Sequence, residues 1–384
     1  MFPRNLTPRN SRSFFLFGAR GVGKSTFIKK QWKVKHHYIN LLLDQWERRY
    51  SASPDQLISD IEALTPCPEW VVIDEIQKIP KLLDVVHELI ESKAIKFILT
   101  GSSARKLKRS GSNLLAGRAN HHQMFPLTHL ELGADFQLQD ALSWGTLPTT
   151  CTLSSEDKAD YLKSYCTTYL KEEILQEQIV RNGVAFRNFL EIVAQSNRET
   201  LNYSRIAKDV GVDHKTIQSY FQILEDTLVG YIIPAYTRSV RKSVKLQPKF
   251  YLFDLGIKRA LSQSLKSELV PGTPPYGDAF EHFMVLEIIR LNEYFRQEFQ
   301  ISHYQTTAGG EIDLILSRNK QVIALEIKSA SRTHLADVTK LERVATPLKP
   351  TEIYYVSQDP VTSKQSKVRC VHWQTFFKEV FLSR

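Results

Sequence analysis

The sequence predicts an α/β fold, in which a P-loop NTPase parallel sheet flanked by helices is followed by a helix-turn-helix segment and a second α/β domain. Three stretches carry this prediction. A glycine-rich loop lies between a strand and a helix pattern within residues 14–30, two amphipathic helices meet at a turn within residues 201–228, and a charged hairpin spans residues 311–328. With 384 residues, the chain is long enough for two or three domains with separate cores.

The glycine-rich loop is the strongest single signal. In FFLFGARGVGKSTFIKK, an apolar strand runs into a GxxxxGK[ST] motif and a helix pattern follows. The backbone N–H groups of such a loop bind phosphates, and the helix N-terminus adds a favourable dipole. We expect Lys24 to reach the β- and γ-phosphates of ATP and Ser25 to coordinate Mg²⁺. The residues expected to contact the nucleotide are Gly18, Ala19, Arg20, Gly21, Val22, Gly23, Lys24, Ser25 and Thr26, the last as a residue of the first helical turn.

A second motif provides the acidic partners that a P-loop needs. In WVVIDEIQKIP, a buried strand over residues 70–73 ends in Asp74, which suits the Mg²⁺ shell, and Glu75, which suits activation of the attacking water. Between the two motifs, HYINLLL at 37–43 predicts a further strand, and residues 54–64 predict a helix. Such an extra strand is expected in the ATPase branch that uses a catalytic glutamate.

Two later segments complete the predicted sheet. In AIKFILTGSS, a strand ends in Thr100, Ser102 and Ser103, which are either polar sensors of the γ-phosphate or residues of an ordinary turn. In NLLAGRANHHQMF, Arg118 is a candidate to stabilise transition-state charge, from its own subunit or from a neighbour, with a surface role as the alternative. Residues 14–125 thus alternate between strands and helices, which indicates a parallel sheet between helical layers.

These motifs together resemble one family, the prokaryotic AAA-type ATPases with a C-terminal DUF4143 module. The resemblance is carried by GARGVGKST, VVIDEIQKIP, ILTGSSARKL, LLAGRA, FPLTHLEL, GTLP, YCTTYLKEEI, LNYSRIAKDVGVDHKTIQSYFQILEDT, PKFYLFDLGI, GDAFEHFMVLEI and the hairpin, in an order that spans about residues 14–330. It implies an ATPase domain (1–130), a winged-helix segment (131–250) and a restriction-endonuclease-like domain (251–384).

The middle segment predicts a helix-turn-helix from its own residues. Ile206, Ala207 and Val210 form one apolar face, Gly211 makes a turn, and Asp213 is suited to cap a second helix. That helix carries the apolar residues Ile217, Tyr220, Phe221 and Leu224 and would expose His214, Lys215, Thr216, Gln218 and Ser219. In DNA-binding versions this surface enters the major groove. The alternative is a packing module that contacts no DNA.

The C-terminal hairpin places three charged groups on one face of a sheet. With a turn around residues 317–320, strands at 312–316 and 322–328 pair antiparallel. Ala324, Glu326 and Lys328 then share a face, with Asp313 opposite Glu326 or one place away. Glu281 lies near the start of a preceding helix, which is predicted to be amphipathic. This constellation is typical of Mg²⁺-dependent PD-(D/E)xK nucleases: Glu281, Asp313 and Glu326 would bind the metal and Lys328 would stabilise charge on the phosphate. In the alternative, the charges pair with one another or bind nucleic acid without cutting it.

Charge and composition narrow the class of protein. The formal net charge is +10, and residues 238–249 carry Arg238, Arg241, Lys242, Lys245 and Lys249 without an acidic residue, as do residues 104–120 with five basic residues. Such runs suit phosphate contacts or a solvated face. A hydrophobic content of 42% excludes a disordered chain, and no membrane span, signal-peptide pattern or CxxC spacing is present. We expect a cytoplasmic protein.

The sequence therefore predicts an ATP- and Mg²⁺-binding ATPase that acts on DNA or is regulated by it, with a C-terminal domain that resembles a nuclease. The alternative is a nucleotide-gated switch that binds DNA or a protein partner and has no nuclease activity. A third possibility is an ATP-driven assembly in which the C-terminal module only mediates contacts in a homo-oligomer.

Overall fold

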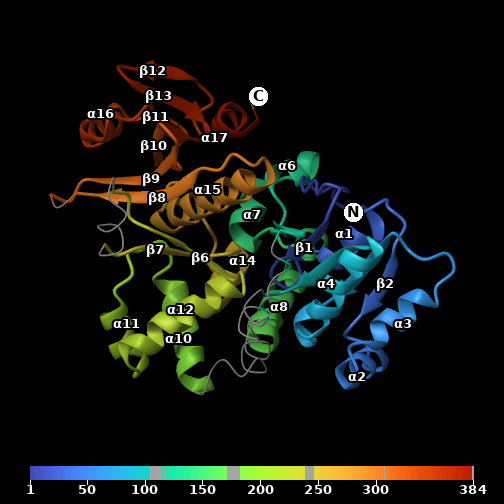
Figure 1. Cartoon of the computed structure of the whole chain (residues 1–384). Coiled ribbons are helices and arrows are strands. Elements are labelled where there is room, and N and C mark those ends of the chain that lie inside the picture. The colour runs from blue at the N-terminus through green and yellow to red at the C-terminus, as the bar shows by residue number, and fades with distance from the viewer. Residues whose placement is uncertain are drawn as a thin grey trace. The chain divides into compact units, whose positions relative to one another are not determined.

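The computed structural model describes residues 1–103, 107, 115, 117–170, 182–237, 246–306 and 308–382. The chain forms two compact units. The first unit contains residues 1–132, 147–149 and 223–229, and the second contains residues 133–146, 150–222 and 230–384. Figure 1 shows the elements of both units.

A five-stranded sheet forms the centre of the first unit. Its strands are β1 (Ser13–Phe17), β2 (His37–Asn40), β3 (Trp70–Asp74), β4 (Lys96–Gly101) and β5 (Ala119–Gln123). Their order is β2-β3-β4-β1-β5, and every neighbouring pair is parallel. Every residue of β1 and β3 is buried, as expected for strands covered on both faces. The predicted parallel sheet is confirmed, and β4 is the strand that separates β1 from β3.

Helices cover both faces of this sheet. They are α1 (Lys24–Lys30), α2 (Asp44–Ala52), α3 (Gln56–Glu62), α4 (Leu82–Lys93) and α6 (His129–Leu132), with a 3₁₀ turn at Ile76–Lys78. On one face Phe15 and Val71 belong to the same core as Leu57 of α3 and Val86 of α4. Phe14 points to the other face, where its ring lies 5.3 Å from that of Trp32, just after α1. The period-2 alternation of the strands thus supplies apolar side chains to both helical layers.

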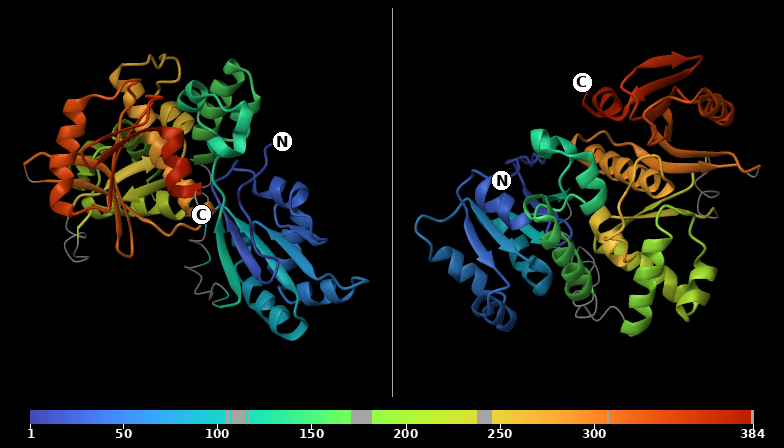
Figure 2. Two further views of the ribbon diagram at one scale, coloured as in Figure 1. Left: turned by 90° about the horizontal axis from the view of Figure 1, so that it is seen from above. Right: turned by 180° about the vertical axis from the view of Figure 1, so that it is seen from behind.

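A second, mixed sheet lies in the second unit. Its strands are β8 (Gln300–Gln305), β9 (Glu311–Arg318), β10 (Gln321–Ile327), β11 (Glu352–Ser357), β12 (Ser363–Gln365) and β13 (Val368–His372), in the order β12-β13-β11-β10-β9-β8. Helix α16 (Leu335–Ala345) packs through Leu341 with Tyr355 on one face. The neighbouring Tyr354 points to the other face and contacts Phe376 of α17 (Trp373–Phe377) at 5.3 Å. Figure 2 shows the two helices on opposite sides of this sheet.

The rest of the second unit is mostly helical. Its longer elements are α7 (Leu138–Trp144), α8 (Ser155–Ser164), α10 (Gly183–Gln195), α11 (Tyr203–Val210), α12 (His214–Asp226), α14 (Leu255–Leu261), α15 (Pro274–Tyr294) and the antiparallel pair β6 (Gly230–Ile233) and β7 (Lys249–Leu252). Shorter turns occupy Gly133–Asp135, Thr150–Thr152, Tyr165–Tyr169, Thr346–Leu348 and Lys378–Leu382. The last residues of α12 cluster with the first unit.

The predicted helix-turn-helix is present as α11 and α12. Gly211 ends α11 with a φ of +78°, a left-handed conformation that glycine adopts without strain. Asp213 then accepts a hydrogen bond from the backbone N–H of Thr216 at 3.0 Å and caps the start of α12. The apolar residues predicted for the facing sides, such as Ile206 and Ile217, are buried.

One helix differs from its sequence-based prediction. The sequence predicts an amphipathic helix over residues 276–295, but in α15 every residue from 280 to 288 is buried. The helix is surrounded by the second unit, so the polar residues among them, including Glu281 and Glu287, require polar partners inside the protein. None of the helices that the structure describes is long and apolar enough to cross a membrane.

Candidate functional site

The P-loop follows β1 and turns into α1 as the motif predicts. Gly21 and Gly23 have φ angles of +80° and +98°, which favour glycine. A side chain at Gly18 would meet the carbonyl oxygen of Met124 at 2.4 Å, so the loop also needs glycine for close backbone packing. Thr26 lies exposed in the first turn of α1.

Lys24 is buried and folds back onto its own loop. Its Nζ donates to the carbonyl oxygens of Gly18 at 2.7 Å and Ala19 at 3.3 Å, and the residue is only 6% exposed. The ammonium of Lys24 therefore lies against the backbone of the phosphate-binding loop in this structure.

Asp74 stands at the end of β3 and accepts hydrogen bonds from three hydroxyl groups. Ser25 Oγ donates to Asp74 Oδ2 at 2.9 Å, the phenol of Tyr38 donates to the same oxygen, and Thr100 Oγ1 donates to Oδ1. Thr100 reaches Asp74 because β4 lies directly beside β3. A Ser25 hydroxyl that donates to Asp74 keeps its lone pairs available, which is the arrangement that a Mg²⁺ ligand pair requires.

Glu75 is held by the residues around it. It has a φ of +64°, an uncommon left-handed conformation for glutamate, and its N–H donates to Thr100 Oγ1 at 3.2 Å. The amide Nε2 of Gln77 donates to the carboxylate of Glu75 and also lies 3.2 Å from Ser102 Oγ. The strand-ending hydroxyls of β4 thus contact both acidic residues, Thr100 directly and Ser102 through Gln77.

In the second unit, the hairpin of β9 and β10 brings Asp313 and Glu326 together. The antiparallel register pairs Leu325 with Leu314, so the next position along pairs Glu326 with Asp313. Asp313 Oδ2 accepts a hydrogen bond from the N–H of Ile327 at 2.7 Å. The predicted convergence of these two carboxylates is confirmed.

Lys328 binds the second of these carboxylates. Its Nζ lies 2.6 Å from Glu326 Oε1. Burial, and then the charge of Asp313, raise the pKa of Glu326 to about 7, although Lys328 opposes the shift. Burial alone would lower the pKa of Lys328, but Asp313 and Glu326 outweigh it and raise the pKa above its ordinary value.

Glu281 of α15 faces the same group of charges. It accepts hydrogen bonds from Arg198 Nη1 at 2.8 Å and from the Tyr251 hydroxyl at 3.0 Å. Burial is the main cause that raises the pKa of Glu281 to about 7, and Asp313 adds to it while Arg198 and Lys249 oppose it. Arg198 also binds Asp278 at 2.6 Å.

Lys249 belongs to this cluster and does not lie on the surface. The sequence groups it with a basic run suited to phosphate contacts, but it is 4% exposed and its Nζ binds Glu311. Its place in β7 turns its side chain inward, which overturns that part of the prediction. Arg238, Arg241, Lys242 and Lys245 lie outside the described residues.

We define Glu281, Asp313, Glu326, Lys328, Arg198 and Lys249 as the carboxylate cluster.

The carboxylate cluster offers ligands of the right type for a hard cation but does not assemble them. Among the residues that the structure describes, no group of three or more His, Cys, Asp or Glu side chains is arranged to hold a metal ion. Glu281 and Glu326 are instead bonded to Arg198 and Lys328. In this conformation two of the predicted metal ligands, Glu281 and Glu326, form ion pairs, as in the alternative that the sequence left open, whereas Asp313 accepts a hydrogen bond from the backbone N–H of Ile327.

Three families match successive parts of the chain. Residues 10–133 match the AAA domain, residues 135–268 match a domain of unknown function (DUF8612), and residues 276–375 match a domain of unknown function (DUF4143). The chain has the AAA and DUF4143 architecture. The P-loop and Asp74 lie in the AAA domain. The carboxylate cluster draws Arg198 and Lys249 from the DUF8612 region and its other members from the DUF4143 region.

The chain is similar in sequence to proteins of mycobacteria and of Haemophilus influenzae. Uncharacterized proteins of Mycobacterium tuberculosis and Mycobacterium bovis are each 23% identical over 318 residues, which cover 82% of this chain and 70% of the relative. An uncharacterized protein of Haemophilus influenzae is 20% identical over 352 residues, covering 83% of this chain and 84% of the relative. Domain III of the Thermotoga maritima replication initiation protein DnaA is 11% identical and covers 52% of this chain and 83% of that chain. Its TM-score is 0.21, too low to carry an argument.

Arg118 of the AAA domain lies away from the P-loop. It immediately precedes β5, whose first residue, Ala119, pairs with Ser13 at the start of β1, whereas the P-loop follows the end of β1. The length of β1 therefore separates Arg118 from the P-loop by about 13 Å. Its guanidinium binds Glu91 of α4 and lowers the pKa of that carboxyl. Arg118 therefore lies near the end of β1 that is farther from the P-loop, and its catalytic role stays a prediction.

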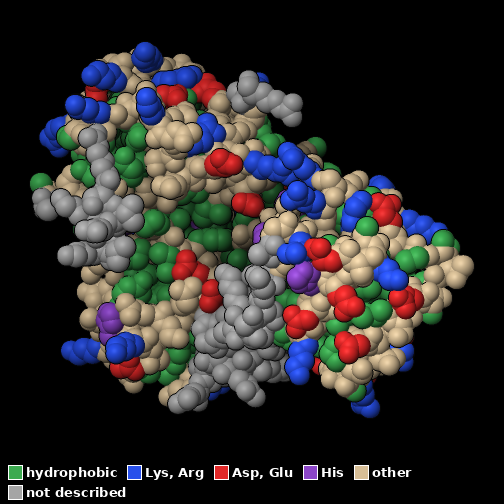
Figure 3. All heavy atoms as spheres, viewed as in Figure 1, with side chains coloured by type: hydrophobic (Ala, Val, Ile, Leu, Met, Phe, Trp, Pro, Cys, Tyr) green, Lys and Arg blue, Asp and Glu red, His purple; other side chains and the backbone are tan. Residues whose placement is uncertain are grey.

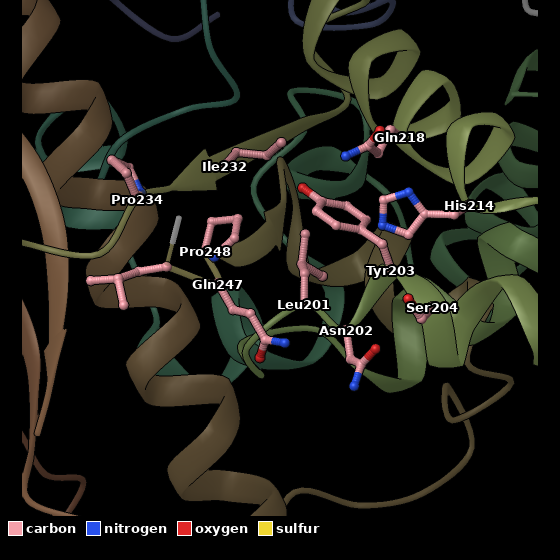
Figure 4. Close-up of a pocket in the computed structure, with 11 residues that line it drawn as sticks. Leu201, Asn202, Tyr203, Ser204, His214, Gln218, Ile232, Pro234, Gln247 and Pro248 are labelled. Carbon is pink, nitrogen blue, oxygen red and sulfur yellow. The ribbon is translucent and has the colours of Figure 1, made fainter. Parts of the chain in front are cut away.

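A pocket of about 520 Å³ lies in the DUF8612 region, next to the helix-turn-helix. Figure 4 shows Tyr203, His214 and Gln218 on one side of it and Pro234 and Pro248 on the other. The remaining lining residues are Leu201, Asn202, Ser204, Ile232, Leu246 and Gln247. None of the described residues that line it is acidic, lysine or arginine. Of the predicted outward-facing residues, His214 and Gln218 thus line a concavity.

Proposed function

We propose that this protein is a Mg²⁺-dependent AAA-type ATPase that hydrolyses ATP and acts together with nucleic acid. The observation that carries the proposal is the hydrogen bond between Ser25 and Asp74, which joins the P-loop to the acidic strand. It coexists with a buried Lys24 whose Nζ donates to the carbonyl oxygens of Gly18 and Ala19. A chance glycine-rich turn would have no reason to meet an acidic strand end in this way.

The residues of the nucleotide site in the AAA domain have separate roles in this proposal. Lys24 binds the terminal phosphates, and the backbone N–H groups of the P-loop bind the phosphate oxygens. Ser25 and Asp74 hold Mg²⁺, which when bound neutralises charge on the phosphates. Glu75 orients and activates the attacking water, and Gln77 sets the position of its carboxylate.

Replacement of Lys24 tests the ATPase proposal. We expect Lys24→Ala to abolish ATP turnover while the protein stays folded, because the ammonium stabilises charge that develops on the transferred phosphate. Lys30→Ala, an exposed lysine of the same helix, is the matched control and should keep wild-type turnover. Unchanged turnover in Lys24→Ala would refute the proposal.

A basic surface supports nucleic acid as the partner. Figure 3 shows Lys and Arg side chains over β12, β13 and α16. Exposed basic residues of these segments include Lys340, Arg343, Lys364 and Lys367. Clusters of this kind bind phosphate backbones by releasing counterions, so affinity for duplex DNA should fall steeply with salt. DNA binding without a salt slope, or no binding at low salt, would argue for a protein partner.

Metal-dependent cleavage of nucleic acid is a second candidate function. Two carboxyl groups, Glu281 and Glu326, have pKa values raised to about 7 by burial and by Asp313, and a divalent cation would relieve their repulsion. The rival is a nucleotide-gated switch whose cluster only holds the second unit together. Incubation of DNA with Mg²⁺ or Mn²⁺ should give cleavage that is lost in Asp313→Ala and Lys328→Ala. Absence of cleavage with single- and double-stranded substrates would favour the switch.

A further inference from the structure

We propose that Tyr38 is a positioning residue of the nucleotide site, which orients the Asp74 carboxylate for the magnesium ion that accompanies the nucleotide. This inference rests on the proposed ATPase function. Nothing in the P-loop or acidic-strand motifs assigns a role to β2, so Tyr38 extends the site to a strand that lies outside both motifs.

Strand pairing puts Tyr38 beside the acidic strand end. In the parallel register of β2 and β3, Tyr38 pairs with Val72 and Asn40 pairs with Asp74. The Tyr38 hydroxyl donates to Asp74 Oδ2, the oxygen that Ser25 also contacts. One carboxylate oxygen thus receives hydroxyls from the P-loop helix and from β2, and Thr100 of β4 binds the other oxygen.

Three hydroxyl donors fix the direction of Asp74 without cancelling its charge. An ionised carboxylate offers about four lone-pair sites, so three donors leave capacity for a cation or its bound water. When Ser25 turns its lone pairs toward a metal, its hydrogen bond to Asp74 must adapt, whereas Tyr38 and Thr100 need not move. Tyr38 therefore keeps Asp74 oriented during metal binding, in the way that residues behind a metal ligand tune affinity.

The Tyr38 phenol donates its hydrogen bond to Asp74, and a contact with Lys29 restrains its ring. The phenol of Tyr38 carries its proton at physiological pH, as tyrosines ordinarily do, and donates it to Asp74. The Lys29 ammonium lies 4.7 Å from the ring centre, a cation–π contact that restrains the ring from the side of α1.

Removal of the hydroxyl tests the proposal, with a matched tyrosine as control. Tyr50, which is buried, likewise donates to a carboxylate, Asp60, at 3.0 Å. We would measure the affinity of a fluorescent ATP analogue in EDTA and across a Mg²⁺ titration, together with the Mg²⁺ concentration that gives half-maximal ATP turnover. Tyr38→Phe should raise that concentration about tenfold and leave binding in EDTA unchanged. Tyr50→Phe should match wild type in all three measurements.

Each outcome separates the inference from the function on which it rests. If Tyr38→Phe has the wild-type Mg²⁺ dependence while the wild type hydrolyses ATP, the inference is wrong and the ATPase proposal stands. If Tyr38→Phe weakens nucleotide binding equally with and without Mg²⁺, its role is structural, and the inference is again wrong. If the wild type has no Lys24-dependent turnover, the ATPase proposal fails, and the Mg²⁺ titration of analogue binding still tests Tyr38. Thermal unfolding of both variants checks that each is folded.

Discussion

The two acidic sites of the molecule differ in the charge of their partners. In the AAA domain, Asp74 accepts hydrogen bonds from three neutral hydroxyls, and it forms no ion pair among the described residues. In the second unit, Glu281 and Glu326 are bonded to Arg198 and Lys328. Asp74 is thus bonded to neutral groups alone among the contacts described, whereas Glu281 and Glu326 each have a cationic partner. A carboxylate held by hydroxyls is prepared for an external cation, whereas one held by arginine or lysine already has its counter-charge.

This contrast predicts opposite responses to neutral substitutions. A buried charge with neutral partners reduces stability and is retained where function requires it. A buried charge with a cationic partner is compensated in part, and its removal leaves that partner without its counter-charge.

The largest effect is expected for Asp74→Asn. The amide keeps the shape and can still hydrogen-bond the hydroxyls, but it removes the charge that attracts Mg²⁺. We expect ATP turnover to fall by about 100-fold or more, with thermal stability unchanged or higher. Steady-state turnover and differential scanning fluorimetry measure the two effects.

Asp60→Asn provides the control for this prediction. Asp60 lies in the same unit but pairs with Arg49, so its loss should leave turnover unchanged and lower stability slightly. A marked loss of stability in Asp74→Asn would mean that Asp74 contributes to the fold as the second-unit carboxylates do. The contrast between the two sites would then be wrong.

An intermediate effect is expected from the pH dependence of Glu281. Its pKa is about 7 in the folded protein against an ordinary value of 4.5, because burial and Asp313 disfavour the charged form. Between these values the folded state binds the proton and the unfolded state does not, so stability is highest below pH 4.5 and falls as the pH rises to 7. Relative to Glu281→Gln, the wild type should lose on the order of 3 kcal/mol over this range.

Comparison with Glu281→Gln removes the contribution of titrating groups that do not interact with this carboxyl. Burial lowers the pKa of the neighbouring His282 to about 3, so His282 destabilises the fold as the pH falls below 6.5, opposite to Glu281. Both proteins contain His282, and its contribution cancels in the difference. Denaturant unfolding at several pH values gives that difference, and parallel curves for the two proteins would contradict the raised pKa.

At both acidic sites, the sequence predicts the carboxylates but not the residues that bind them. The P-loop, Asp74 and the Asp313–Glu326 hairpin were predictable because each depends on contiguous residues, strand period or a short turn. The partners of these residues were not. Tyr38 reaches Asp74 only because β2 is the neighbour of β3 in the register that pairs Asn40 with Asp74. Sequence pattern identifies a strand there but does not give its place in the sheet.

Ion pairs between residues far apart in the chain could not be predicted from the sequence for the same reason. Arg198 and Glu281 are 83 residues apart, and no local pattern links them. Lys249 was misassigned because a basic run suggests an exposed surface, whereas strand β7 turns this one lysine inward to Glu311. A lysine next to the apolar run FYLF was the available signal for burial, since residues of such a strand lie inside on both faces.

The smallest effect is expected for Arg118→Ala, and it addresses whether the nucleotide site of the AAA domain is complete within one chain. Arg118 lies at the end of the strands opposite to the P-loop and pairs with the exposed Glu91. Its removal should therefore change the turnover of dilute protein by less than twofold. An arginine that serves a neighbouring subunit would behave differently, because its contribution would require assembly. If Arg118 acts in a neighbouring subunit, turnover per chain should rise with protein concentration in the wild type but not in Arg118→Ala. If turnover is instead independent of concentration and equal in both proteins, Arg118 has no catalytic role, and Lys24 remains the basic side chain of the P-loop site with an assigned part in phosphate transfer.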